Sequence, residues 1–202
     1  VLDEVKEIIE LPEFDPTTMG SETDPDLIDL DPAVISQLRE CVVAMATSYN
    51  LNPFHNFEHA SHVGMSVAKL LSRIVAADDC VYDKPSSLES SKHDHTFGIT
   101  SDPLTQFAVI FATLIHDVDH GGVSNGQLIK EQTEVATLYN NKSVAEQNSI
   151  DVAWELLRES SYEELRNRIF ASDAEYHRFR SLVINVFIAP DIFDTVLNEF
   201  RS

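Results

Sequence analysis

Apolar residues spaced three and four positions apart recur along most of this chain, and that spacing limits the fold more than any other feature. It places the apolar side chains on one face of an α-helix. Glycine occurs only 6 times, and runs in which apolar and polar residues alternate are scarce, which disfavours a β-sheet. We therefore predict an all-α fold, a compact multi-helix bundle.

Two aspartate–proline pairs mark the starts of two predicted helices. Asp31 and Asp102 can each cap a helix, and the proline that follows each of them suits the first helical position. The second of these helices reads LTQFAVIFATLIHD and is apolar on nearly all sides, which predicts a central place in the bundle. Another helix is expected from about Asn56, and the polar residues 78–101 are expected to form a long surface loop.

The chain has 202 residues, which is enough for one domain with a sizeable core. Residues 1–30 are acidic and contain three prolines, so we expect a lead-in segment with one short helix at 2–10. A single domain is expected over residues 31–202. The sequence begins with valine and ends in a stretch of helical pattern, so we expect it to be part of a larger protein.

Acidic residues outnumber basic ones by 34 to 14, and the formal net charge is −20. A chain this acidic is repelled by nucleic acid and by anionic lipid, so neither is an expected partner of this segment. The sequence has no apolar run long enough to span a membrane, and we expect a cytoplasmic location, even if the parent protein is membrane-anchored. An anionic substrate fits only if a bound metal ion reverses the charge locally.

Histidines and aspartates gather in two segments of the chain. His55 and His59 lie four residues apart and so share one face of a helix. The segment HDVDH, residues 116–120, places two histidines and two aspartates at the end of the apolar helix. Buried aspartates need a cationic or hydrogen-bonding partner. Imidazole with carboxylate suits zinc and similar ions, while carboxylate with water suits magnesium or manganese, so the two segments predict a divalent metal site.

Ordinary structural roles also explain several of these residues when each is taken alone. His55 can be a hydrogen-bonded core histidine, and HDVDH can be a helix end with solvated acids. Glu146 stands three residues after Ser143, in the capping-box pattern. His62 is expected to pack or to face solvent, and the remaining histidines are expected at the surface: His93, His95 and His177.

Two stretches, FHNFEHASHVGMSV and LIHDVDHGGVSNGQLI, resemble the paired motifs Tyr-His-Asn-x-x-His-Ala and His-Asp-x-Asp-His-x-Gly. The motifs are those of the catalytic domain of class I 3′,5′-cyclic nucleotide phosphodiesterases. A later stretch, EVATLYNNKSVAEQNS, is similar to that family's Leu-x-Tyr-Asn segment followed by Ser-Val-x-Glu. The similarity runs from about residue 32 to the end of the chain. It implies a bundle of the HD/phosphodiesterase type, truncated at its C-terminus.

The resemblance also implies an activity, the metal-dependent hydrolysis of cyclic AMP, cyclic GMP or both to 5′-nucleoside monophosphates by a metal-bridged hydroxide. His55 matches the general acid that protonates the leaving O3′ atom. His59, His116 and Asp117 match ligands of a tightly held zinc ion, and Asp117 would also reach a second ion, magnesium or manganese. Three further positions match residues that support the ligands or hold metal-bound water: Asp119, His120 and Glu146.

The chain departs from the family pattern at several positions, none of which is a direct metal ligand. Phenylalanine replaces tyrosine at 54, histidine replaces aspartate at 62, and glycine replaces proline at 121. Gln147-Asn148-Ser149 replaces the family's Asn-His-His. We expect these changes to act on the surroundings of the ligands.

The family's fourth protein ligand is an aspartate in an Ala-Asp-Leu-Ser-like motif, and no such motif occurs before Ser202. Asp173, Asp191 and Asp194 qualify by residue type alone. We therefore expect the isolated chain to hold an incomplete site and to be inactive or nearly so, although the parent protein hydrolyses cyclic nucleotides. The family's purine-binding residues lie further on, so the residues that bind the substrate are not assigned.

Three other functions stay open from the sequence. HNFEH, residues 55–59, also fits the inverted zinc-peptidase pattern His-x-x-Glu-His, in which both histidines bind zinc and Glu58 is the general base. An HD-type phosphohydrolase that acts on another nucleotide shares the His…His-Asp pattern. A non-catalytic regulatory domain could use the same scaffold without a metal.

Overall fold

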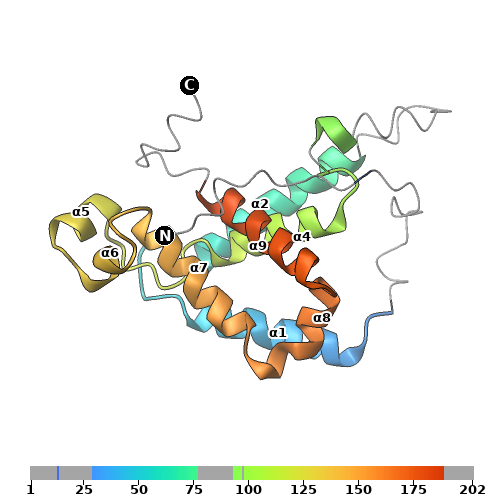
Figure 1. Ribbon diagram of the computed structural model, residues 1–202, viewed down its shortest axis with the longest axis horizontal. Coiled ribbons are helices and arrows are strands. Elements are labelled where there is room, and N and C mark those ends of the chain that lie inside the picture. Colours follow the sequence, from blue (N-terminus) through green and yellow to red (C-terminus); the bar gives the residue numbers. More distant parts are fainter. Residues whose placement is uncertain (1–12, 14–28, 77–92, 97, 189–202) are drawn as a thin grey trace.

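The computed structural model describes residues 13, 29–76, 93–96 and 98–188. Within them every regular element is helical, which confirms the predicted all-α bundle (Figure 1). The elements are α1 (Pro32–Thr47), α2 (Phe57–Ala76), α4 (Pro103–Ile115), α5 (Asn125–Lys130), α6 (Glu134–Leu138), α7 (Val144–Leu157), the 3₁₀ turn η3 (Ser160–Tyr162), α8 (Glu163–Ile169) and α9 (Asp173–Ile188). The expected helix at 2–10, nearly all of the acidic lead-in and most of the expected loop 78–101 lie outside the described residues.

Both aspartate caps form as predicted. The Asp31 carboxylate accepts a hydrogen bond from the Ala33 N–H group at 2.8 Å. The Asp102 carboxylate accepts from the N–H groups of Leu104 and Thr105 at 3.3 and 3.1 Å. These N–H groups have no partner inside the first helical turn, so the caps fix where α1 and α4 begin.

The start of α2 is held by Asn56, whose side-chain oxygen accepts a hydrogen bond from the His59 N–H group at 2.9 Å. His59 therefore lies in the first turn of α2. Further along, Gly64 lets α2 approach α4 closely, because a Cβ atom added there would lie 3.2 Å from the Thr113 hydroxyl oxygen. The two histidine segments are thus carried by helices that are packed directly against each other.

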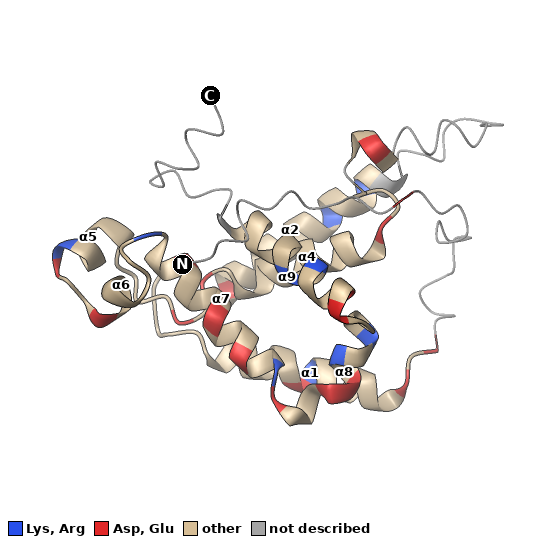
Figure 2. Ribbon diagram, in the orientation of Figure 1, with Lys and Arg blue, Asp and Glu red and all other residues tan. Residues whose placement is uncertain are grey.

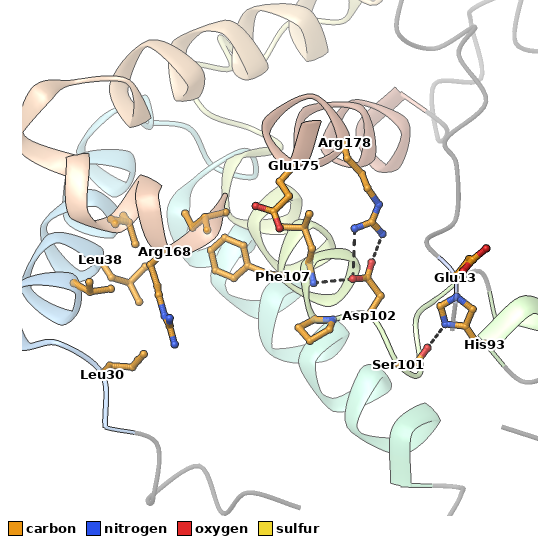
Figure 3. Close-up of a pocket in the computed structure, with 15 residues that line it drawn as sticks. Glu13, Leu30, Leu38, His93, Ser101, Asp102, Phe107, Arg168, Glu175 and Arg178 are labelled. Carbon is orange, nitrogen blue, oxygen red and sulfur yellow. Dashed lines mark hydrogen bonds and ion pairs between the residues drawn. The ribbon is translucent and has the colours of Figure 1, made fainter. Parts of the chain in front are cut away.

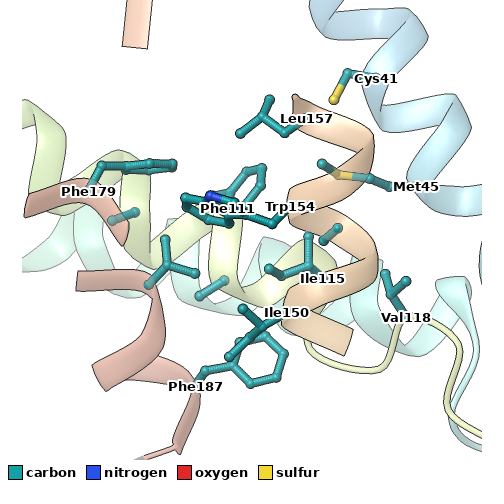
Figure 4. Packing of buried hydrophobic residues seen from close by; sticks show 14 of the residues in the cluster. Cys41, Met45, Phe111, Ile115, Val118, Ile150, Trp154, Leu157, Phe179 and Phe187 are labelled. Atoms are coloured by element: carbon teal, nitrogen blue, oxygen red, sulfur yellow. The ribbon is translucent and has the colours of Figure 1, made fainter. Parts of the chain in front are cut away.

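The apolar helix α4 lies at the centre of the bundle, as predicted, and contacts α1, α2, α7 and α9 (Figure 1). Three buried rings from different helices meet in the core: Phe111 of α4, Trp154 of α7 and Phe179 of α9 (Figure 4). Their ring centroids lie 5.5 to 6.1 Å apart. Close-packed aromatic contacts of this kind hold helices rigidly, so the C-terminal end of α4, which leads into HDVDH, is firmly placed.

Acidic residues are distributed over several helices, including α7 and α8 (Figure 2). Basic residues are fewer, as the composition of the chain requires. No helix among the described residues is long and apolar enough to cross a membrane.

Candidate metal centre

The structure brings His59, His116 and Asp117 together, although His59 is far from the other two in sequence. Each offers one ligand atom, and the three atoms lie within 4.8 Å of one another. A second group with the same property contains His55, Asp117 and His120. Asp117 belongs to both groups, so a single carboxylate lies between two places where an ion could bind.

The Asp117 carboxylate is largely buried, with 10 % of its side chain exposed. Its Oδ2 atom lies 2.9 Å from His55 Nδ1 and 3.2 Å from His116 Nε2. Burial alone would raise the pKa of Asp117, but the hydrogen bonds and charges of His116 and His55 outweigh it and lower the pKa. The side chain is therefore an anion at neutral pH, which is the state that binds a cation.

The hydrogen bond on the far side of the His116 ring shows which of its nitrogens faces the site. His116 Nδ1 lies 2.9 Å from the carbonyl oxygen of Thr113 and must be the donor, because a carbonyl only accepts. In the neutral ring Nε2 then carries a lone pair that faces the Asp117 oxygen. Two acceptors 3.2 Å apart need a proton or a cation between them. A histidine that donates its other N–H to a backbone carbonyl is the usual arrangement of a metal ligand.

His55 is set in place by a turn centred on Asn52. The Asn52 side-chain oxygen accepts hydrogen bonds from the N–H groups of Phe54 and His55 at 3.0 and 3.1 Å. The His55 ring stacks on His120, with centroids 3.8 Å apart and planes 22° from parallel. Burial and the nearby His55 lower the pKa of His120. The Nδ1 atom of His120 accepts a hydrogen bond from the Gly122 N–H group at 2.9 Å.

Gly122 has a positive φ of 74°. A Cβ atom there would lie 2.3 Å from the Asn52 side-chain nitrogen. Only glycine lets the turn after HDVDH pass this close to the turn that carries His55.

Phe54, which stands where the family has tyrosine, is an exposed ring at the edge of the site. Its centroid lies 4.4 Å from that of His59 and 5.0 Å from that of His55. The ring thus restricts the orientation of two imidazoles by packing alone.

Glu146 joins neither metal group, and its predicted capping box is wrong. Ser143 has a φ of 37° and makes no side-chain cap of α7. The Glu146 carboxylate instead accepts a hydrogen bond from the Asn125 amide at 2.8 Å. The Asn125 oxygen accepts from the Ala145 N–H group at 2.9 Å, which fixes the orientation of the amide. Asn125 therefore holds Glu146.

Asp119 also joins neither metal group. Its side chain is exposed and accepts hydrogen bonds from two asparagine amides, those of Asn50 and Asn148. Glu58 and His62 are exposed on α2, and Asp173 is exposed at the start of α9. Asp191 and Asp194 lie outside the described residues.

One histidine prediction is wrong. His93 is buried, with 3 % exposed, and its Nδ1 atom forms a hydrogen bond with the Ser101 hydroxyl. The polar sequence around it suggested a surface position, but both His93 and Ser101 are buried in the structure. His95 and His177 are exposed, as predicted.

A cavity of about 640 Å³ lies at the other end of α4, beside the Asp102 cap (Figure 3). Arg178 of α9 forms an ion pair with Asp102 there, and His93 and Ser101 line the same cavity. None of the predicted site residues lines it. The cavity is therefore separate from the metal centre.

Two asparagines that hold the site were missed in the sequence, Asn52 and Asn125. Asn52 precedes Pro53, a pair that is typical of turns, so its position could have been noticed. Asn125 follows the residues GGVS, which are typical of a loop. That pattern does not indicate the hydrogen bond from Asn125 to Glu146, which lies 21 residues later.

Comparison with known proteins identifies the family of this chain. The model of the 3′5′-cyclic nucleotide phosphodiesterase family matches residues 54–200. The chain belongs to this family. The match spans both histidine segments and the segment that contains Glu146, so the resemblance of the motifs is confirmed.

Curated relatives within this phosphodiesterase family are of moderate similarity. A Caenorhabditis elegans protein named "Probable 3′,5′-cyclic-AMP phosphodiesterase pde-4" is 34% identical over 144 residues, which cover 71% of this chain and 18% of the relative. The mouse "Dual specificity calcium/calmodulin-dependent 3′,5′-cyclic nucleotide phosphodiesterase 1C" is 32% identical over 169 residues, which cover 83% of this chain and 21% of the relative. The chain thus spans about a fifth of the length of these relatives.

The fold agrees with solved phosphodiesterase structures. The phosphodiesterase domain of the RhoPDE fusion protein from the choanoflagellate Salpingoeca rosetta superimposes with a TM-score of 0.60 and 28% identity. The matched part covers 79% of this chain and 45% of that chain. The chain therefore shares the family's helical fold over somewhat less than half of the solved domain.

Proposed function

We propose that the protein hydrolyses 3′,5′-cyclic nucleotides to 5′-monophosphates with the help of two divalent metal ions. The proposal is carried by one observation: the Asp117 carboxylate lies with His59 and His116 in one group of possible ligand atoms, and the same carboxylate faces His55. Membership of the family supports the reaction. Relatives named for cyclic AMP, cyclic GMP and dual specificity support the substrate class without selecting one nucleotide.

The donors suit the proposed ions. His59, His116 and Asp117 offer two imidazole nitrogens and one carboxylate oxygen, which is a donor set that zinc accepts. The second ion, magnesium or manganese, would share Asp117 and take most of its remaining ligands from water. When bound, such ions neutralise the phosphodiester charge and lower the pKa of a water that attacks phosphorus.

His55 is proposed as the general acid. Its Nδ1 atom lies 2.9 Å from the Asp117 carboxylate, and this hydrogen bond fixes the orientation of the ring. The Nε2 atom can then give its proton to O3′ as the bond between phosphorus and O3′ breaks. Water supplies the hydroxyl that phosphorus gains, and the proton that it loses replaces the one that His55 gave. One bond to phosphorus forms, one breaks, and the leaving oxygen departs as an alcohol.

Two other positions are assigned supporting roles. His120 stacks on His55 and is proposed to limit the motion of the general acid's ring. Glu146, fixed by Asn125, is proposed to hold a metal-bound water, a role that does not need direct contact with an ion. The small-molecule partner is the cyclic nucleotide, and a cytoplasmic location stays a prediction.

Removal and return of metal tests the proposal. The full-length natural protein, stripped with EDTA, is expected to lose hydrolysis of cyclic AMP and cyclic GMP and to regain it with Zn²⁺ plus Mg²⁺ or Mn²⁺. Product chromatography should show 5′-monophosphates. Failure of the metal-loaded protein to hydrolyse either nucleotide would contradict the proposal, and turnover of a different nucleotide would favour the broader HD-type phosphohydrolase.

The peptidase alternative finds less support in the geometry. It requires His55 and His59 to bind one ion, yet they belong to different groups, and Glu58 is exposed and joins neither. A regulatory domain without metal would keep no tightly bound zinc in the purified protein, so elemental analysis separates it from the enzyme.

A further inference from the structure

The HDVDH turn is tied to two other parts of the molecule through a single residue, Asp119. Its backbone N–H group donates to the carbonyl oxygen of Ser48, just after α1, at 3.1 Å. Its carboxylate accepts from the Asn50 amide at Oδ1 and from the Asn148 amide at Oδ2, each at 3.0 Å. Asp119 therefore joins the end of α1, the turn after α4 and helix α7.

The same turn has a second link to α7. The buried Ser149 hydroxyl donates to the carbonyl oxygen of Val118 at 2.6 Å. Between these two anchors the backbone takes an unusual shape, since Asp119 has a positive φ of 58°. Aspartate tolerates this conformation better than most residues, but external contacts are needed to hold it. Two residues of the metal groups lie close by in the chain, since Asp117 stands two positions before Asp119 and His120 directly follows it.

We propose that Asn148 is a positioning residue of the metal centre, which acts through Asp119 to fix Asp117 and His120. The inference rests on the proposed metal binding. It assigns a function to a position where this chain has asparagine and the family motif has histidine. Asn50 supports the same carboxylate from the opposite side.

The hydrogen-bond chemistry of the pair makes the proposal testable. A carboxylate only accepts, and the two amides only donate toward it, so each oxygen of Asp119 has one donor. Asn148→Asp places a second carboxylate against Asp119 and so forces the pair apart. Asn148→Asp combined with Asp119→Asn exchanges the roles, because the new amide donates to the new carboxylate and its oxygen still accepts from Asn50.

The experiment measures zinc affinity of the full-length protein by competition with a chelator, together with the visible spectrum of bound Co²⁺. Asn148→Asp is expected to weaken zinc binding about 10- to 100-fold, the usual effect of losing a residue that supports a ligand. The exchanged double variant is expected to return to within about threefold of the wild type and to restore the Co²⁺ spectrum. Circular dichroism confirms that each variant folds.

The matched control is Asn167→Asp, which makes the same charge change at an exposed position of α8. This variant should bind zinc as tightly as the wild type. If Asn148→Asp does not fold, Asn148→Ala removes the donor without adding charge and should still weaken binding. Wild-type affinity in the folded Asn148 variants, or no recovery in the double variant, would overturn the inference. Should Asp117→Asn also leave zinc affinity unchanged, the proposed metal centre itself fails.

Discussion

Replacement of Asp117 by asparagine is expected to abolish tight zinc binding and to lower cyclic nucleotide hydrolysis about 10³-fold, because a metal ion contributes several kcal/mol to transition-state stabilisation. Asparagine keeps the size of the side chain and removes its charge. Since Asp117 is proposed to bind both ions, one substitution weakens both proposed ion sites. Zinc affinity and kcat/KM, each measured on the full-length protein, check the two parts of this expectation.

Asp173→Asn is the matched control for that variant. Asp173 is exposed at the start of α9 and joins no metal group, so its loss of charge should change neither zinc affinity nor turnover. An Asp117→Asn protein that binds zinc as tightly as the wild type would show that the carboxylate is a structural partner of His55 and His116 and not a ligand.

The second large effect is expected at His55. Asparagine at this position can place its amide nitrogen where Nδ1 lies and so keep the hydrogen bond to Asp117. It has no equivalent of Nε2, so the proton donor to O3′ is lost. Hydrolysis of cyclic nucleotides should fall about 10²- to 10⁴-fold, the usual contribution of a general acid, while zinc affinity changes little.

A substrate with a better leaving group separates this role from a structural one. A nitrophenyl phosphodiester releases a stable anion that needs no protonation, so His55→Asn should hydrolyse it nearly as well as the wild type. His62→Asn, on the exposed face of α2, is the control and should be active on both substrates. Equal losses on the two substrates would argue against proton donation by His55.

The helical fold could be predicted from the sequence because its signals are local. Asp31 and Asp102 precede prolines, and each caps its own helix within three residues. The apolar sequence of α4 already indicated burial on all sides. The predicted Ser143 capping box is wrong, since Ser143 makes no side-chain cap. Glu146 accepts a hydrogen bond from Asn125, 21 residues away, and no local pattern indicates that contact.

The structure brings together His59, His116 and Asp117, which the sequence could single out because the two histidine segments are recognisable as motifs. The residues that hold those segments together could not be predicted in this way. Asn148 reaches Asp119 across 29 positions, and Asn50 reaches it across 69. Such contacts depend on how α1, α4 and α7 pack, and asparagine is common enough in loops and on helix surfaces that its presence alone indicates no partner.

Anomalous diffraction from crystals of the full-length protein grown with Zn²⁺ would show directly whether the side chains of His59, His116 and Asp117 bind zinc. We expect a zinc peak bonded to one nitrogen of His59, to Nε2 of His116 and to an oxygen of Asp117, each at about 2.0–2.2 Å. His116 should keep its Nδ1 hydrogen bond to the Thr113 carbonyl. Zinc bound at other side chains, or no peak between these three at saturating zinc, would contradict this expectation.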